Sequence, residues 1–465
     1  MRRTLLPDLP TLRAMVTQVL VDKEEQGHDV SGWAERLAAT PDSYDALLAV
    51  ANALEDLPLV EGWPHVEPDE LSAIWAEADP ARALTPAPYD AEDVARRVET
   101  AWYARVAGCI LGKPFEFDPT LAELRSVLEP AGEWPLRDYV TLATNARLRQ
   151  PQPQWPELVR EQIRHVCEDD DLNYTVLAML LLERYGDGFT HDDVRRLWLL
   201  QLPVLATFGP ERTQLIAAAT STLSALAEKA GDETAAEGSW GSLLNPADEH
   251  CGALIRADAY GWACPGDPAR AATLAHRDAS LTHRRTGVYA TVFVAAALAA
   301  ALVADPDDRL GPFETALGFV PQRSRFAAIV RDSLGQVSAA SDWLDGYERI
   351  HGRYALWSHC RVYQEVGTLL NTARFATDVG HGIGLQVCQG NDTDSFGATA
   401  GSYLGALLGP EAFDRAHWTD RFGNRIHLAL ATFHEQSLSA IAARMVALPS
   451  LLSRGHTAGH GTGTG

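Results

Sequence analysis

The chain has 465 residues, of which 46% are hydrophobic and 22% charged, and its formal net charge is -23 at pH 7. These values are typical of a globular protein with one large domain or two, and they exclude an intrinsically disordered chain. The acidic balance argues against nucleic acid as a main partner, because no stretch dense in lysine and arginine offers phosphate contacts.

The cysteines and the apolar segments bear on location. The six cysteines, at positions 109, 167, 251, 264, 360 and 388, include no CxxC pair, which argues against a zinc ribbon. Residues 1–7 lack a long apolar run, so we expect no secretory signal and a cytoplasmic protein with free thiols. The most hydrophobic run, residues 288–303, is shorter than the ~20 residues that a membrane span needs. We therefore predict a buried core helix there and no membrane partner.

The chain divides into three predicted parts. Residues 1–95 form a helical extension, in which apolar residues recur at helical spacing over 12–20 and 46–54 before a proline-rich surface strap over 63–88. Residues 96–450 form the main domain. The remaining residues, 451–465, are rich in glycine, threonine and histidine, and we expect them to be disordered.

Nearly every segment of the main domain has the apolar periodicity of a helix, and none shows sustained alternation of apolar and polar residues. We therefore predict an all-α fold. The predicted helices span residues 98–110, 172–185, 191–206, 212–229, 268–280, 284–303, 324–336, 361–376 and 392–408.

In the last of these helices glycine recurs every four residues, at positions 397, 401, 405 and 409. On a helix this spacing makes a stripe without side chains, against which another backbone can approach closely. Each glycine costs about 1 kcal/mol relative to alanine in a helix, so close packing must offset the loss. The stripe predicts a central helix with Asp392 and Asp394 at its buried N-terminal end.

Two acidic motifs each lead into an apolar helical segment. Residues 168–171 have the sequence Glu-Asp-Asp-Asp, and residues 390–395 have the sequence Gly-Asn-Asp-Thr-Asp-Ser. Simple helix caps or an Asx-turn are the alternative interpretation. However, crowded carboxylates repel each other by about 1 kcal/mol per pair even in water, and a hard divalent cation would neutralise them. The motifs therefore predict two halves of one metal site and, as the leading hypothesis, a hydrolase.

Three further segments are candidate parts of this site. Residues 112–116, Gly-Lys-Pro-Phe-Glu, describe a tight loop that presents the carboxylate of Glu116, although an ordinary helix end would look similar. Arg256 and Asp258 flank a helix-breaking region and are alternatively an ion pair. His283 opens the most hydrophobic helix, where a histidine is more often a core residue or a cap than a ligand.

Taken in order, these motifs resemble those of the ADP-ribosylglycohydrolase family over about residues 98–445. Segment 112–116 is similar to the family's Gly-x-Pro-x-Glu loop, and segment 168–171 falls at its Thr-Asp-Asp-Thr motif. Segment 252–256 is similar to Gly-Ala-x-x-Arg, and segment 390–395 is similar to Gly-x-Asp-Thr-Asp-Thr. Five motifs in this order are far more specific than any one alone.

The fifth motif and a closer resemblance complete the comparison. Thr282 and His283 fall where a Ser/Thr-His pair opens a long alanine-rich helix in the family. The Glu-Asp-Asp-Asp motif and the Ile-Arg-Ala-Asp-Ala-Tyr-Gly run at 255–261 resemble a bacterial subgroup of the family.

The resemblance implies an orthogonal multi-helix bundle around two divalent cations, Mg or Mn. It implies that Glu116 acts in acid–base catalysis and that Asp392 helps to position the attacking water. The implied metal ligands are Glu168, Asp169, Asp170, Asp392, Asp394 and Ser395. The implied substrate-binding residues are Gly112, Lys113, Asp171, Asn173, Arg256, Asp258, His283 and Asn391.

The chain departs from the family pattern at several positions. Glu168, Asp171 and Ser395 each stand where the family has Thr, and Cys251 stands where much of the family has Asn. Lys113 adds a positive charge that could meet a phosphate or a carboxylate. These departures bear on the substrate more than on the chemistry.

The activity that the resemblance implies is hydrolysis of an N-glycosidic bond at ribose C1 of an ADP-ribosylated protein or nucleic-acid adduct. A small nucleoside- or NAD-derived metabolite is an alternative substrate, which a site mouth narrowed by the extension would favour. A third alternative is a non-catalytic binder of ADP-ribose-like ligands, and the complete acidic set together with Glu116 argues against it.

Overall fold

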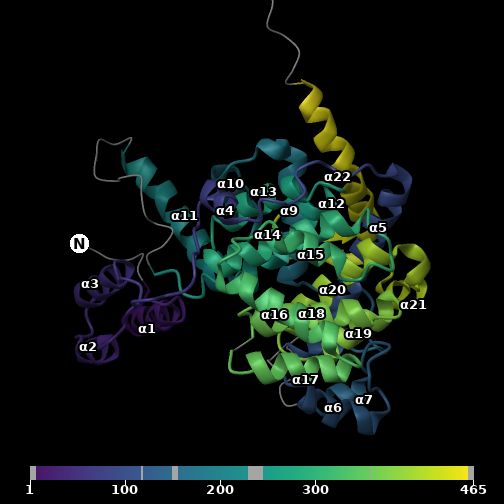
Figure 1. Cartoon of the computed structure of the whole chain (residues 1–465), viewed down its shortest axis with the longest axis horizontal. Coiled ribbons are helices and arrows are strands. Elements are labelled where there is room, and N and C mark those ends of the chain that lie inside the picture. Colours follow the sequence, from purple (N-terminus) through teal and green to yellow (C-terminus); the bar gives the residue numbers. More distant parts are fainter. Residues whose placement is uncertain (1–6, 117–118, 149–154, 229–243, 358, 459–465) are drawn as a thin grey trace, which may run out of the picture.

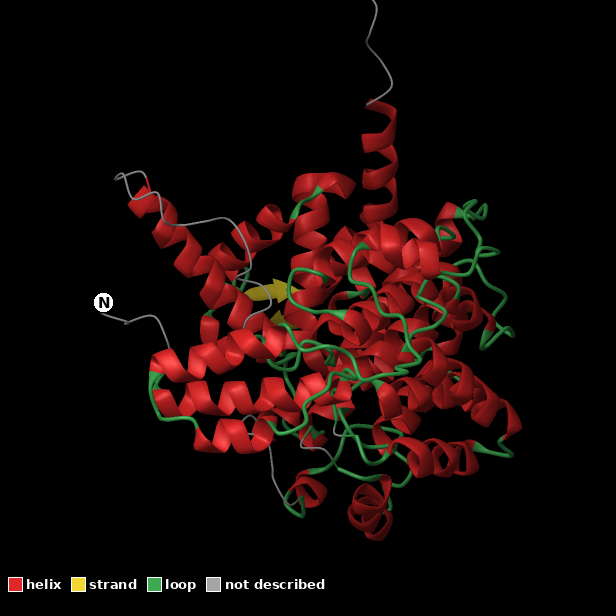
Figure 2. Cartoon of the chain, turned by 60° about the vertical axis from the view of Figure 1, so that its left-hand side comes forward, coloured by secondary structure: helices red, strands yellow, loops and turns green. Residues whose placement is uncertain are grey.

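The computed structural model describes residues 7–116, 119–148, 155–228, 244–357 and 359–458. Within them the chain forms 22 α-helices and one antiparallel strand pair, β1 (Arg425–His427) with β2 (Glu435–Ser437). The predicted all-α class is confirmed (Figure 2). Among the described residues, no helix is both long and apolar enough to cross a membrane.

The N-terminal extension supplies most of a second, small hydrophobic core, to which Leu244 of the main body also belongs. Helices α1 (Leu9–Glu25), α2 (Trp33–Ala39) and α3 (Tyr44–Glu55) pack together and lie beside the main body (Figure 1). Leu12 and Leu47 are fully buried between them. The two helical segments predicted within residues 1–95 are therefore confirmed.

The strap that follows the extension contains a helix that the sequence did not predict, α4 (Leu71–Glu77). Ile74 of this helix is fully buried in the core of the main body. A helix of about two turns contains too few residues to show a clear apolar periodicity, and the prolines around it favoured a prediction of irregular structure. The strap is consequently tied to the body and ends at Asp90, whose side chain caps the next helix.

The main body is built around one pair of helices, α5 (Ala91–Gly112) and α20 (Thr393–Leu408), which lie against each other over most of their length (Figure 1). The other helices surround this pair. Their bounds are α6 (Leu121–Leu128), α7 (Leu142–Asn145), α8 (Trp155–Leu158), α9 (Asp170–Tyr185), α10 (His191–Gln201), α11 (Gly209–Glu228), α12 (Asp258–Trp262), α13 (Pro268–Ala279), α14 (Arg285–Ala301), α15 (Gly311–Leu317), α16 (Arg325–Ala339), α17 (Trp343–Tyr354), α18 (Tyr363–Phe375), α19 (Val379–Cys388), α21 (Arg415–Thr419) and α22 (Leu438–Ala458).

The nine predicted helices of the main domain all exist, with differences at their ends. Helix α14 is buried along nearly its whole length, as predicted for the most hydrophobic run. Helix α10 ends at Gln201 rather than at 206, because Pro203 disfavours helical backbone at the residue before it. Helix α22 continues to Ala458, so residues 451–458 are helical where a disordered tail was expected. The rest of that predicted tail lies outside the described residues.

The glycine stripe of α20 packs on α5 as predicted, with one correction. A side chain on Gly401 would overlap the backbone of Ala104, and one on Gly397 would lie 2.6 Å from the carbonyl oxygen of Gly108. Gly409 does not belong to the stripe. It follows the end of the helix with a φ of 73° and a ψ of -173°, a conformation that glycine adopts without strain because it has no Cβ.

The glycine contact gives a stability prediction. Gly401→Ala should lower the free energy of unfolding by about 1–3 kcal/mol, because the new methyl group forces α5 and α20 apart. Gly335→Ala is the matched control, since it lies inside α16 with open space around its Cα, and it should stabilise by about 0.5–1 kcal/mol. Urea unfolding of both variants measures the difference. Equal effects at the two positions would contradict the prediction.

Candidate functional site

The two acidic motifs, which lie far apart in the sequence, meet at the N-terminal ends of two helices. Asp169 caps α9 by accepting a hydrogen bond from the backbone of Asp171 at 2.9 Å, and Asp392 occupies the same position before α20. The hydroxyl of Ser395 donates to Oδ2 of Asp171 at 3.2 Å and joins the two helix ends directly. The structure therefore brings both motifs into one acidic centre.

The carboxylates of this centre are buried. Asp169, Asp171 and Asp394 are each at most 3% exposed. Burial and then the charge of Asp169 raise the pKa of Asp171 and of Asp394. Burial followed by Asp169 also raises the pKa of Asp170 well above its usual value. A positive charge placed in this centre would therefore favour the ionised form of several carboxyl groups at once.

The donor set of the centre fits a hard cation. Oδ1 of Asp394 is buried and has no hydrogen-bond partner among the described residues. Oδ1 of Asp171 is also buried without a hydrogen bond there, and it lies 3.6 Å from the guanidinium of Arg105. Leaving a buried acceptor unsatisfied costs about 1–3 kcal/mol, and more if it is charged. Carboxylate and hydroxyl oxygens are the ligands that Mg²⁺ and Mn²⁺ prefer. The residues present are thus suited to the cations that the family resemblance implies.

The loop after α5 supplies a positive charge to the acidic centre, Lys113. Its ammonium group donates to Oδ2 of Asp169 at 2.6 Å and lies 3.7 Å from Oε2 of Glu116. Burial opposes ionisation of Asp169, yet Lys113 holds the pKa of this carboxyl below its usual value. Lys113 is itself only 6% exposed. It therefore meets a carboxylate of the protein, where the sequence had suggested a substrate group.

Glu116 differs from the other acids because it combines access with a raised pKa. Its side chain is 34% exposed. Burial and then Asp394 raise the pKa of Glu116 to about 9, although Lys113 acts in the opposite direction. Glu116 thus lies beside the acidic centre as a carboxyl that holds its proton near neutral pH, which is the property of a general acid.

Pro119 and Thr120 are fixed to the second acidic motif. The backbone N–H of Asn391 donates to the carbonyl of Pro119 at 2.8 Å, and Thr120 forms a β-bridge with Gly390. Gly390 has a φ of 81° and would overlap Pro119 if it carried a side chain, so the position requires glycine. The side chain of Asn391 is oriented by Gln364, whose amide donates to its Oδ1 at 3.0 Å.

Glu168 lies apart from the buried acids. Its side chain is 46% exposed, and Oε1 lies 3.4 Å from Nδ1 of His434 on the loop between the two short strands. The chain passes from exposed to buried between Glu168 and Asp169, where α9 begins. The part of the predicted ligand set that the structure brings together is therefore Asp169, Asp170, Asp392, Asp394 and Ser395.

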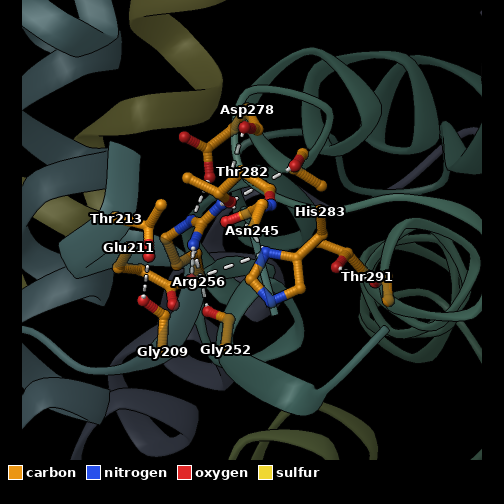
Figure 3. A network of polar contacts seen from close by, with 12 residues as sticks. Gly209, Glu211, Thr213, Asn245, Gly252, Arg256, Asp278, Thr282, His283 and Thr291 are labelled. Atoms are coloured by element: carbon orange, nitrogen blue, oxygen red, sulfur yellow. Dashed lines mark hydrogen bonds and ion pairs between the residues drawn. The ribbon is translucent and has the colours of Figure 1, made fainter. Parts of the chain in front are cut away.

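Arg256 and His283, two of the predicted substrate contacts, lie in a buried framework of polar contacts (Figure 3). Asp258, a third, is buried as well. Arg256 donates to Asp278 at 2.6 Å and to Glu211 at 2.5 Å, and also bonds Thr282. Asp258 pairs with Arg105 at 3.0 Å, not with Arg256 as the ion-pair alternative supposed.

His283 belongs to the same framework. Its Nδ1 lies 2.7 Å from the hydroxyl of Thr282, and burial followed by Arg256 lowers its pKa well below the usual value. The imidazole is therefore neutral. With no exposed surface, Arg256, Asp258 and His283 hold the fold and do not line an open site.

Two other residues that were predicted to contact substrate instead form hydrogen bonds within the protein. Gly112 is buried beneath the backbone of Thr393, whose hydroxyl donates to its carbonyl at 2.8 Å. The side chain of Asn173 accepts from the N–H of Ala429 at 2.9 Å. Both residues fix the helix ends that carry the acids. A surface hollow lined by residues 188–192 and Arg277 includes none of the predicted site residues.

Three residues of the centre were not singled out from the sequence as site residues. The thiols of Cys251 and Cys360 lie 3.2 Å and 3.4 Å from Oδ2 of Asp392. Arg105 donates to the carbonyl of Asp171 at 3.0 Å and so holds the first turn of α9. The two cysteines are far apart in the sequence and form no recognisable motif with each other, and Arg105 lies inside an apolar helix. Only Cys251, which precedes the Gly-Ala-x-x-Arg segment, could have been identified from the sequence.

The N-terminal extension is anchored to the two segments that carry these cysteines. Oδ2 of Asp22 accepts from the N–H of Ala247 at 2.8 Å, and Oδ1 accepts from Arg361 at 2.9 Å. Arg361 follows Cys360 directly and is 4% exposed. One carboxylate of α1 therefore ties together both chain segments that border Asp392.

The raised pKa of Glu116 predicts how stability depends on pH without divalent cations. Its folded pKa of about 9 exceeds the ordinary 4.5, so the folded state holds an extra proton between these values. The associated stability is present below pH 4.5 and is lost as the pH rises toward 9. Glu116→Gln should flatten this decline, measured by urea unfolding in chelator at stepped pH. A curve parallel to the wild type, or the same flattening in the exposed control Glu348→Gln, would contradict the assignment.

The comparison with protein families agrees with the motifs. The model of the family described as ADP-ribosylglycohydrolase matches residues 90–449. A chain of a solved "ADP-ribosylglycohydrolase-related protein complex" is similar, with 19% identity over 78% of this chain and 99% of that chain, at a TM-score of 0.46. No curated protein matches the sequence. Because the family match spans most of the chain, the protein belongs to the ADP-ribosylglycohydrolase family.

Proposed function

We propose that the protein hydrolyses the N-glycosidic bond at ribose C1 of an ADP-ribosyl or related ribosylated substrate. The family supports a glycohydrolase that acts on substrates of this general type. The observation that carries the proposal is the joining of the two buried acidic motifs through Ser395 and Asp171, with Glu116 beside them on a separate loop. Acids on two sides of one centre are what glycosidic hydrolysis requires.

Two divalent cations, Mg²⁺ or Mn²⁺, are the cofactors that we propose for this centre. Asp170, Asp171, Asp392, Asp394 and Ser395 would hold them. Oδ1 of Asp394, which is buried and has no hydrogen-bond partner among the described residues, supports this assignment. When bound, such cations orient the ribose hydroxyls and lower the pKa of a water molecule. Lys113 occupies one oxygen of Asp169, which leaves the other residues of the centre as the better ligands.

Glu116 is the residue that we assign to proton transfer. Its raised pKa favours the protonated carboxyl, which can give its proton from Oε to the departing nitrogen. After the bond breaks, the carboxylate can accept a proton from the incoming water. Lys113, 3.7 Å from Oε2, stabilises that ionised form. Asp392 would orient the attacking water, since its carboxylate lies at the N-terminal end of α20.

A small ribosylated metabolite is a second candidate substrate, and the anchoring of the extension favours it. The contacts of Asp22 with Ala247 and Arg361 hold a separate helical unit against the segments that border Asp392. A site with an added unit at its border suits a compact substrate more than a protein surface.

A substrate panel tests the proposed activity. With added Mg²⁺ and Mn²⁺, release of ADP-ribose from ADP-ribosyl-arginine or ADP-ribosyl-serine peptides would support the first substrate class. Release of ribose or ribose phosphate from NAD, nicotinamide riboside or nucleosides would support the second. On the substrate that is cleaved, Glu116→Gln should lower kcat by about 10²–10⁴-fold, the range for loss of a general acid. Full turnover by Glu116→Gln would refute its role, and Glu348→Gln on an exposed part of α17 is the control.

Removal of a single buried charge tests the proposed cations. Asp394→Asn should bind less metal by elemental analysis, and added Mg²⁺ should raise its Tm less than that of the wild type. The metal-free variant should be at least as stable as the wild type, because Asp169 and burial both disfavour the Asp394 charge. Asp307→Asn, in an exposed loop, controls for loss of one acid. Unchanged metal content in folded Asp394→Asn would remove the basis for the cation assignment.

A further inference from the structure

Two thiols and one carboxylate converge at the border of the acidic centre. Cys251 begins the short 3-10 segment η5 (Cys251–Arg256), and Cys360 lies just before α18. Their sulfur atoms lie 3.2 Å and 3.4 Å from the same oxygen, Oδ2 of Asp392. One ligand atom from each of the three residues lies within 4.8 Å of the other two. Three chain segments that are remote in sequence thus present ligand atoms to one point.

The spacing of these atoms matches a tetrahedral cation site. With Zn–S bonds of about 2.3 Å and Zn–O bonds of about 2.0–2.2 Å, neighbouring ligands of a tetrahedron lie about 3.3–3.8 Å apart. The two sulfur–oxygen distances at Asp392 are close to this range without any movement. Oxygen-only ligands select Mg²⁺ and Mn²⁺, whereas thiolates select softer cations such as Zn²⁺. The chemistry of this group therefore differs from that of Asp171, Asp394 and Ser395.

A second, independent feature points to a ligand at the same place. Glu365 is 1% exposed, and its Oε1 accepts the backbone N–H of Cys360 at 2.6 Å. Its other oxygen, Oε2, is buried and has no hydrogen-bond partner among the described residues. The side chain of His359 also interacts with the Cys360 thiol. Metal sites commonly have a buried acid of this kind beside their ligands, where it orients them.

We propose that Cys251, Cys360 and Asp392 form a binding site for a thiophilic divalent cation, of which Zn²⁺ is the best match to these ligands. Cys251 is buried and Cys360 is half-buried, so the site has access from the side of Cys360. Binding replaces the thiol protons, which leave to solvent, and the cation then holds both sulfurs as thiolates. Glu365 supports the site by fixing the backbone of Cys360.

Because Asp392 is shared, this cation bears on catalysis as well. Zn²⁺ bound through the two thiols takes up the carboxylate that the proposed Mg²⁺ centre also uses. Zinc should therefore inhibit Mg²⁺-supported turnover, and Cys360→Ser should resist that inhibition. This consequence rests on the proposed function, whereas binding of Zn²⁺ does not.

The binding experiment uses the full chain, reduced and stripped of metal under anaerobic conditions, with its thiols counted beforehand. Titration with Zn²⁺ against a chromophoric chelator should give one tight site. Cys251→Ser and Cys360→Ser should each weaken it by at least about 10–100-fold. Cys264→Ser is the matched control, since Cys264 is buried and free but belongs to neither group of candidate ligands, and it should bind Zn²⁺ like the wild type.

Cobalt gives a readout that does not depend on the variants. Co²⁺ in the wild-type site should show thiolate-to-metal charge-transfer absorption in the near ultraviolet, and Zn²⁺ should bleach it. Absence of that band would overturn the proposal even if a variant failed to fold. Zinc affinity that stays unchanged in folded Cys251→Ser and Cys360→Ser would overturn it as well. Neither result touches the glycohydrolase activity, which the substrate panel decides separately.

Discussion

The close approach of α5 and α20 is the constraint on which the rest of the structure depends. Glycine at 397 and 401 lets the backbones touch, and it fixes how α20 lies along α5. The C-terminal end of α5 carries Lys113 and leads to Glu116, while the N-terminal end of α20 carries Asp392, Asp394 and Ser395. Because the helices are antiparallel in this sense, their contact places the proton-transfer loop and the second acidic motif side by side. A shift of one helix along the other would separate them, so the packing determines the chemistry.

Electrostatics in the centre work against the stability of the metal-free fold. Asp171, Asp392 and Asp394 each have a raised pKa, with burial as the largest cause. Lys113 offsets only part of this demand, through its contact with Asp169. Such a concentration of unfavourable burial is typical of functional sites, where stability is given up for reactivity. The protein tolerates it because the surrounding helices bury a large apolar core and because Arg105 and Arg256 neutralise the acids that lie deeper.

Sequence reasoning reached the helices and the acidic centre but not the supporting contacts. Periodicity and the glycine stripe predicted α9 and α20, and the need to neutralise crowded acids predicted that residues 224 positions apart would meet, as Ser395 and Asp171 do. Gly409 was wrongly assigned to the stripe, because a helix-terminating glycine continues the same spacing. Cys360 was not predicted as a site residue, because Cys251 and Asp392 come from other segments and form no sequence motif with it. The sequence also did not predict the ion-pair partners of Arg256, because only the folded structure brings Glu211 and Asp278 next to it.

The contact between Asp22 and Arg361 has a consequence for synthesis of the protein. The two residues lie 339 positions apart, and at about 5–20 residues per second this separates their emergence from the ribosome by tens of seconds or more. Most residues of the small core around Leu12 and Leu47 belong to the extension, so they are made before those of the main body. The acidic anchor, Asp22, is therefore made long before Arg361, the guanidinium that it binds. The border of the acidic centre is therefore completed only after Asp392 has been made, so a product truncated before this residue holds the acids of α9 without an assembled site.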